Sequence, residues 1–151
     1  MSVRQLEWFD NPASCTEVEI VSVESELGVI FPSDYRDFLL IGAGGSPVET
    51  DFRLQDSRGR GDASIGVFLS PDEGEYGILP TIRMVGERAL SGLIPIAESG
   101  GGDFVCLDYR QSNVPTISYW YQGRHGESDE VIAVCETFEN FLGMLHAPND
   151  S

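Results

Sequence analysis

Histidine, the usual base in nucleophilic catalysis, occurs only twice in this chain, and the potential nucleophiles form no recognisable catalytic pattern with it. A nucleophilic Ser, Cys or Thr needs a base beside it. The two histidines are His125, in a predicted turn, and His146, at the end of the last predicted helix, where a cation favours the helix dipole. The sequence SGGGD at 99–103 differs in order from the G-x-S-x-G elbow of hydrolases. We therefore assign no catalytic residue.

The stretch PIAESGGGDFVCLDY, residues 95–109, raises the question of phosphate binding. A phosphate loop offers backbone N–H groups, usually a lysine, and the N-terminus of a following helix. Here two acids, Glu98 and Asp103, flank the glycines, and the sequence contains no lysine. The apolar residues 104–107 that follow indicate a buried strand. The stretch therefore predicts a glycine hairpin between two strands rather than a nucleotide loop.

Two acidic clusters, DEGEY at 72–76 and ESDE at 127–130, could attract a cation. Neither has the alternating ligands and later glutamate of a calcium loop, so we predict solvated turns, with no metal and no cofactor. A pair of carboxylates for glycoside hydrolysis stays open as an alternative. We interpret the RGD tripeptide at 60–62 as part of a flexible loop.

The strongest compositional feature is acidity, with 25 Asp and Glu against nine arginines and a net charge of −16. Residues 1–40 hold eight acids and two arginines, and residues 127–151 hold six acids and no arginine. Such a charge disfavours nucleic acid and anionic membranes as partners. It favours a basic protein partner, with a merely solubilising surface as the equally weighted alternative.

The length of 151 residues suits one domain, which we place at 1–147, followed by a tail at 148–151. No apolar run approaches the ~20 residues of a membrane helix, and the start lacks the apolar core of a signal peptide. The three cysteines, Cys15, Cys106 and Cys135, form no C-x-x-C pair and suit a reducing compartment. These features predict a soluble cytoplasmic protein.

Helices are predicted at both ends of the chain and strands between them. The first helix covers 14–27, with Thr16 or Ser14 as its cap, Val18, Val21 and Leu27 as its apolar stripe, and Ile20 and Val23 widening that stripe. A second helix covers 34–42 and a closing helix 136–146. Residues 46–64 are expected to be a loop, with a short strand near 52–54 as an option. Segment 78–92 is ambiguous, with a helix that has Pro80 at N1 as one interpretation.

Strands are predicted at 65–70, 93–98, 103–109, 116–122 and 131–135. This order predicts an α+β fold: an antiparallel or mixed sheet flanked by N-terminal helices and a C-terminal helix.

Three blocks in this order resemble the SUKH superfamily of Smi/Knr-like proteins: VESELGVIFPSDYRDFLLIGAGG, LIPIAESGGGDFVCLDY and VIAVCETFENFLGML. Ala43 departs from the family pattern, where Asn often precedes the paired glycines, and so do Cys135 and Glu136. The matching positions that we assign to the fold are Glu24, Gly28, Pro32, Tyr35, Gly44, Gly45, Pro95, Gly102, Asp108 and Phe138.

The resemblance implies a protein-binding module rather than an enzyme. Bacterial members are similar to immunity proteins that neutralise a cognate toxin, often a nuclease, and a eukaryotic branch resembles a regulatory scaffold. We expect an immunity protein with a basic toxin domain as its partner; a scaffold is the alternative and a small hydrolase the remote one. The expected contacts are acids in exposed loops: Asp72, Glu73, Glu75, Glu98, Asp103, Glu127, Asp129 and Glu130.

Overall fold

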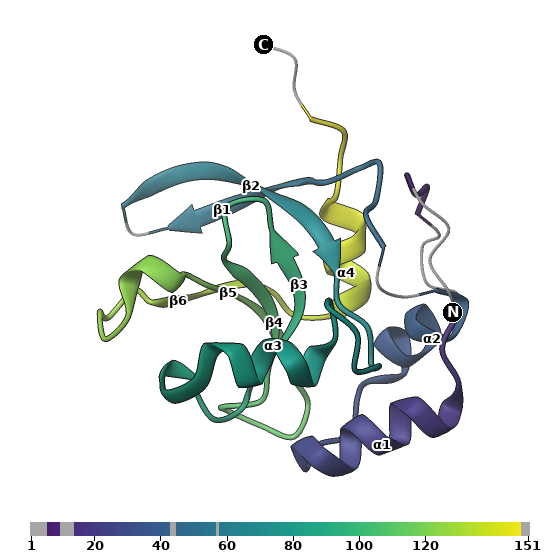
Figure 1. The fold of residues 1–151 in the computed structure, drawn as a ribbon. Helices are drawn as coiled ribbons and strands as arrows, with labels where there is room; N and C mark the ends of the chain where they lie inside the picture. The colour runs from purple at the N-terminus through teal and green to yellow at the C-terminus, as the bar shows by residue number, and fades with distance from the viewer. Residues whose placement is uncertain (1–5, 10–13, 43–44, 57, 149–151) are drawn as a thin grey trace.

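The structure, a computed structural model, describes residues 6–9, 14–42, 45–56 and 58–148. The elements follow in the order α1 (Glu17–Leu27), α2 (Ser33–Ile41), β1 (Asp51–Asp56), β2 (Gly59–Phe68), α3 (Ile78–Val85), β3 (Leu93–Ser99), β4 (Phe104–Asp108), β5 (Thr116–Trp120), β6 (Val131–Cys135) and α4 (Phe138–Met144). Short 3-10 turns lie at Gly86–Arg88 and Gln122–Arg124. The strands pair antiparallel in the order β1 to β6, so the predicted α+β fold is confirmed (Figure 1).

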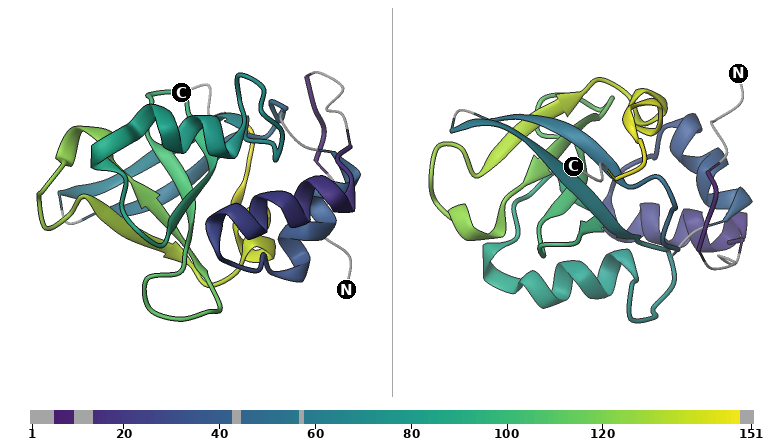
Figure 2. Two further views of the ribbon diagram at one scale, coloured as in Figure 1. Left: turned by 60° about the horizontal axis from the view of Figure 1, so that its bottom comes forward. Right: turned by 90° about the horizontal axis from the view of Figure 1, so that it is seen from above.

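The sheet is curved, and helices cover its two faces. Figure 2 shows α4 on one side of the sheet and α3 on the other. Helix α4 contacts β1, β5, β6 and α2, and the edge strands β1 and β6 approach one another. The register shifts between Ile65 and Val67, between Pro95 and Ala97, and between Ile117 and Ser118. Such bulges increase local twist, which helps the sheet to curl around α4.

Helix α1 begins and ends as its sequence predicts, but it buries a different stripe. Thr16 forms a capping box with Glu19, and Gly28 ends the helix with a φ of 71°. Ile20 and Val23 are buried, whereas Val18 is 78% exposed and Val21 is 50% exposed. The prediction that Val18 and Val21 lead the buried stripe was wrong. Apolar residues occur around most of this helix, so periodicity alone could not choose the side that packs.

Residues 46–64, expected to be mostly loop, contain β1 and the first half of β2. The two strands form a hairpin whose register runs from Asp51 opposite Ser64 to Asp56 opposite Gly59. Phe52 and Leu54 are buried and alternate with exposed residues. The polar and glycine-rich composition of this segment does not indicate a strand, although the inward side chains of β1 pack in the core. The RGD tripeptide therefore lies within β2, not in a flexible loop.

Helix α3 resolves the ambiguous segment. Gly77 is the N-cap, so Pro80 is the third helical residue rather than the first. The helix ends at Val85 because Gly86 adopts a φ of 65°, and Leu90 lies beyond it.

The glycine hairpin between β3 and β4 is confirmed. Ser99 N donates to Asp103 O at 2.8 Å, and Gly102 has a φ of 92°. The structure therefore uses the glycines of this stretch to reverse the chain between two buried strands.

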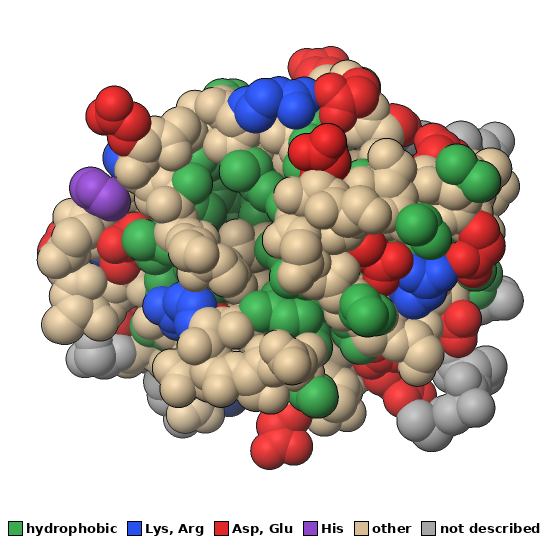
Figure 3. Space-filling view, turned by 90° about the horizontal axis from the view of Figure 1, so that it is seen from below, with side chains coloured by type: hydrophobic (Ala, Val, Ile, Leu, Met, Phe, Trp, Pro, Cys, Tyr) green, Lys and Arg blue, Asp and Glu red, His purple; other side chains and the backbone are tan. Residues whose placement is uncertain are grey.

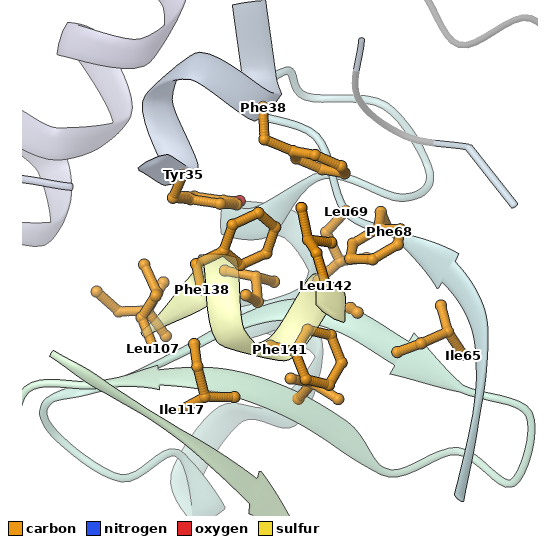
Figure 4. Packing of buried hydrophobic residues seen from close by; sticks show 14 of the residues in the cluster. Tyr35, Phe38, Ile65, Phe68, Leu69, Leu107, Ile117, Phe138, Phe141 and Leu142 are labelled. Carbon is orange, nitrogen blue, oxygen red and sulfur yellow. The ribbon is translucent and has the colours of Figure 1, made fainter. Parts of the chain in front are cut away.

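The main core lies between α2, α4 and the concave face of the sheet. Phe138 packs against Tyr35 and Phe38 with ring centroids 5.0 Å apart in each case (Figure 4). The ring centroids of Phe141 and Phe52 are also 5.0 Å apart. A smaller apolar cluster under α3 covers the other face: Val85, Leu93, Phe104, Cys106 and Trp120. The predicted inner face of the closing helix is confirmed: Phe138, Phe141, Leu142 and Leu145 are buried.

We predict that Phe138→Ala lowers the free energy of unfolding by about 3–5 kcal/mol, because it leaves a cavity between α2, α4 and β2. Urea denaturation followed by circular dichroism measures this. Val114→Ala, at a residue that is 75% exposed, is the control and should change stability by no more than about 0.5 kcal/mol. A loss below about 1 kcal/mol for Phe138→Ala would contradict the packing described here.

Tyr35 gives a second test of the core. Its side chain is fully buried, and within the described part of the chain its hydroxyl has no hydrogen-bond partner. A buried polar group without a partner costs about 1–3 kcal/mol. We predict that Tyr35→Phe leaves the free energy of unfolding unchanged or raises it by about 1 kcal/mol. A clear loss of stability in the same denaturation experiment would mean that the hydroxyl is bonded in solution.

Candidate functional site

The acids that the sequence proposed as partner contacts fall into three separate groups. The first, in the turn before α3, is exposed as expected. Asp72 Oδ1 accepts from Gly74 N at 2.8 Å, and Glu73 pairs with Arg83 at 2.5 Å. Asp72 and Glu75 have no basic partner among the described residues. This turn therefore presents negative charge to solvent.

The second group lies at the β3–β4 hairpin and is less accessible than predicted. Glu98 and Asp103 are both half-buried. Asp103 accepts hydrogen bonds from Gln122 N at 2.8 Å and from the hydroxyl of Tyr119 at 3.2 Å. The carboxylate of Asp103 thus ties the hairpin to the end of β5, and its predicted full exposure was wrong.

The third group lies in the turn before β6, where predicted exposure fails most clearly for Glu130. Glu130 is only 8% exposed and accepts from Trp120 Nε1 at 2.8 Å and from Gly126 N at 3.0 Å. Asp129 is half-buried, while Glu127 is exposed and pairs with Arg58. A buried indole N–H needs an acceptor, and Glu130 supplies it from the turn that precedes β6.

Ion pairs join this third group to the β1–β2 hairpin. Arg124 forms a two-point contact with Asp56, at 2.7 and 3.0 Å, and Arg58 Nε lies 2.8 Å from Asp129. The guanidinium of Arg124 also lies 3.6 Å from the centre of the Tyr121 ring. The turn at 72–75 and the turn at 127–130 lie far apart in the molecule (Figure 1). The eight predicted contact acids therefore do not form one surface.

A hollow of about 530 Å³ opens beside these ion pairs; we call it the sheet mouth. Asp56, Asp103, Tyr119, Tyr121 and Arg124 are among its lining residues. Hydrogen bonding to Arg124 holds the pKa of Asp56 well below its usual range, and burial with the neighbouring Asp56 carboxylate raises the pKa of Tyr121 to about 12. At neutral pH, Asp56 is thus an ion-paired carboxylate and Tyr121 a neutral phenol.

A larger hollow of about 750 Å³, which we call the α1 groove, runs between α1 and two loops of the sheet. One wall consists of Val21, Glu24, Ser25 and residues 27–30; the other consists of Ser91, Gly92, Tyr109 and Asn113. Figure 3 looks at this side of the molecule and shows hydrophobic side chains in surface hollows, with acidic side chains toward the side where Figure 1 places α1 and α2. The groove was not predicted from the sequence. The apolar residues around most of α1 did indicate that some of them stay outside the core.

Glu24 holds the α1 wall in place. Its Oε2 accepts from Phe31 N at 2.6 Å, and its Oε1 lies 2.7 Å from Arg36 of α2. Pro32 precedes α2 in an extended conformation, as predicted. Among the other positions assigned to the fold, Gly44 lies outside the described residues. Glu24 is thus a structural residue at the edge of a candidate binding surface.

Asp108 bridges the end of β4 to its neighbours. It accepts from Arg110 Nε at 3.0 Å, from Arg110 N at 3.0 Å and from the hydroxyl of Ser118 at 2.7 Å. Burial opposes ionisation of Asp108, but these hydrogen bonds outweigh it, so its pKa lies below the ordinary value of 3.8. Asp108 thus links the end of β4 to the following turn and to β5.

Residues with metal-binding potential do not gather in the described part of the chain. No group of three or more His, Cys, Asp and Glu there could hold a metal ion. Burial raises the pKa of both Cys15 and Cys135 to about 11, so these thiols are protonated at neutral pH. No helix in the described segments is long and apolar enough to cross a membrane.

A curved antiparallel sheet with two N-terminal helices and a closing helix, carrying surface hollows and an acidic exterior, defines a compact α+β domain. A model of the SMI1 / KNR4 family (SUKH-1) matches residues 14–144. The chain therefore belongs to this family, as the three sequence blocks predicted. Comparison with curated proteins gave no significant match.

Asp108 also generates a prediction about acid stability. A carboxylate whose pKa is lower in the folded than in the unfolded chain stabilises the fold above its ordinary pKa, here 3.8. That stabilisation is lost as the pH falls through the folded value. Between pH 6 and pH 3, Asp108→Asn should therefore lose less unfolding free energy than the wild type. Asp37→Asn, at an exposed position of α2, is the control and should follow the wild type; equal slopes for all three proteins would refute the prediction.

Proposed function

We propose that this member of the SMI1/KNR4 family is a non-enzymatic protein-binding module, and that its partner is a basic toxin domain which it neutralises in the cytoplasm. The observation that carries the proposal is that the chain is strongly negative while many of its arginines are already paired with its own carboxylates. The chain carries a net charge of −16, and much of its positive charge is already paired within the chain.

The arginines supply this evidence. Five of those whose side chains are described form ion pairs with the chain's own carboxylates: Arg36, Arg58, Arg83, Arg110 and Arg124. Because these arginines are occupied, an approaching protein meets mostly negative charge. Such a surface attracts a basic partner and repels nucleic acid.

Charge of this kind acts mainly on the rate of association. Complementary charge can raise the association rate by about 10–10³-fold, and salt screens the effect. An inhibitor of a toxin must bind before the toxin acts, so fast association has a direct benefit. A nuclease suits this role as the partner because it carries positive charge for its phosphate substrate, which an acidic protein can imitate.

A hydrolase is the less supported function. The sheet mouth does hold two carboxylates, Asp56 and Asp103. A general acid at neutral pH needs a raised pKa, whereas the pKa of Asp56 is lowered by its two-point contact with Arg124. Asp103 already accepts two hydrogen bonds from the chain. Both carboxylates therefore have structural roles that account for their positions.

We predict that the triple variant D72N/E73Q/E75Q slows association with the toxin domain encoded beside this gene by about 3–10-fold at low salt. These side chains are exposed, and Asn at position 72 keeps an acceptor for Gly74 N, so the turn should stay folded. Surface plasmon resonance against an inactive form of the toxin, at 20 and 500 mM salt, measures the rate. The difference between variant and wild type should disappear at high salt.

The matched control removes three exposed carboxylates from other parts of the surface: E7Q, D62N and E136Q. If steering depends on the whole field of the molecule, the control slows association as well; if it depends on the turn, only the first variant does. A rate that is independent of salt in the wild type, or an unchanged rate in both variants at low salt, would refute steering. Failure of the wild type to bind the toxin or to protect cells that produce it would refute the proposed function.

A further inference from the structure

We infer that the α1 groove is the docking site of the partner, and that it receives an apolar side chain flanked by lysine or arginine. This inference rests on the proposed function and specifies where and how the partner is held. Four kinds of observation support it: the shape of the groove, the apolar residues at its edges, the bonds that fix its walls and the charge of one wall.

The shape is that of a binding site for a protruding side chain. The groove has a volume of about 750 Å³ and is lined by a mixture of apolar and polar groups. Binding hollows typically measure about 300–1,000 Å³ and combine apolar walls with a few polar groups. Here Val21, Leu27 and Ile30 supply apolar surface, and Ser25 and Asn113 supply polar groups.

Exposed apolar residues concentrate at the edges of this groove. Ile30 is 78% exposed and Val21 is 50% exposed, and both line it. Val18 precedes Val21 by nearly one turn of α1, and Val114 follows the lining residue Asn113. A single exposed apolar residue needs no explanation, but several around one hollow mark an interaction surface.

The walls of the groove are fixed before any partner arrives. The hydroxyl of Tyr109, on one wall, donates to the carbonyl oxygen of Ile30 on the other at 2.8 Å. Glu24 binds both Phe31 N and Arg36, which holds the segment after α1 against α2. A preformed site loses little conformational freedom on binding, so more of the contact energy contributes to affinity.

The acids around the α1 wall select the chemistry of the occupant, because the wall itself contains a single acid, Glu24. Residues 17–41, which comprise α1, α2 and their connection, contain six acids and one arginine. That arginine, Arg36, is already paired with Glu17 and Glu24. Positive groups beside the inserted apolar side chain would therefore be attracted to this wall. A second copy of the chain, with its own charge of −16, would be repelled.

The sheet mouth is the less suitable docking site. Its charged side chains are tied to one another by the ion pairs of Arg58 and Arg124. A partner that entered there would have to break these ion pairs, or it could not bind the charged side chains that form them. The α1 groove requires no such change.

The experiment compares two bulky substitutions on the same helix. Ser25→Trp places an indole in the groove, whereas Ser22→Trp places it on an exposed part of α1 outside the groove. The probe is the inactive toxin domain encoded beside this gene, and titration calorimetry measures the dissociation constant. We expect Ser25→Trp to weaken binding by about tenfold or more and Ser22→Trp to leave it within about twofold of the wild type.

A second pair of variants keeps the test valid if a tryptophan disturbs the helix. Val21→Ser with Ile30→Ser removes the apolar edges of the groove, and Met84→Ser removes an apolar residue of α3 that is 72% exposed but does not line it. The double variant should weaken binding by about tenfold and Met84→Ser should not. If the wild type binds and all four variants bind equally well, the groove is not the docking site, although the proposed function stands. If the wild type does not bind, the proposed function and this inference both fail.

Discussion

The structure depends on the way α4 fills the concave face of the sheet. Phe138 joins three elements, because its ring packs against Tyr35 and Phe38 of α2 and against Phe68 of β2. Phe141 extends the contact to Phe52 of β1. A curved antiparallel sheet of this size exposes a large apolar surface on its inner side, and only a helix with several large rings on one face can cover it. The position of α2 follows, since it packs on α4, and α1 in turn packs on α2. The outer helices are therefore placed by contacts that originate at the last helix of the chain.

This order of packing explains why apolar residues remain exposed on the surface of α1. Helix α1 packs on α2 and buries mainly Ile20 and Val23, together with the hydrogen-bonded carboxylate of Glu24. Val18 and Val21 of this helix remain exposed, whereas Leu27 packs partly against the core. The ion pairs of Arg36 with Glu17 and Glu24 then fix this helix by polar contacts where apolar burial is small. A helix held in this way keeps an exposed apolar side without losing its place in the fold, which is the physical requirement for a surface that binds another protein.

Sequence patterns predicted the elements whose signals are local, and they failed where neighbours in space decide. The cap at Thr16, one of the two residues proposed for it, the glycine turn at 100–102 and the apolar face of the closing helix were predicted correctly, because each depends on residues a few positions apart. The β1–β2 hairpin was missed because its burial comes from Phe141 and Tyr119, which are far away in the sequence. The same reason applies to Glu130: only the pairing of β5 with β6 shows that it lies beside the indole of Trp120. The α1 groove could not be predicted, because its two walls come from segments about 60 to 90 residues apart.

Charge and shape therefore contribute to binding in different ways in this protein. The negative field of the whole molecule acts at a distance and carries little information about orientation, so it can accelerate encounter with many basic proteins. Discrimination among basic proteins needs short-range contacts, in which an apolar side chain of the correct partner fits a fixed hollow and that of another protein does not. The carboxylates that are locked by Arg58 and Arg124 contribute to the field but cannot easily form new pairs. The exposed carboxylates of the 72–75 turn and the apolar edges of the α1 groove are separate features, so electrostatic attraction and specific docking can vary independently of one another.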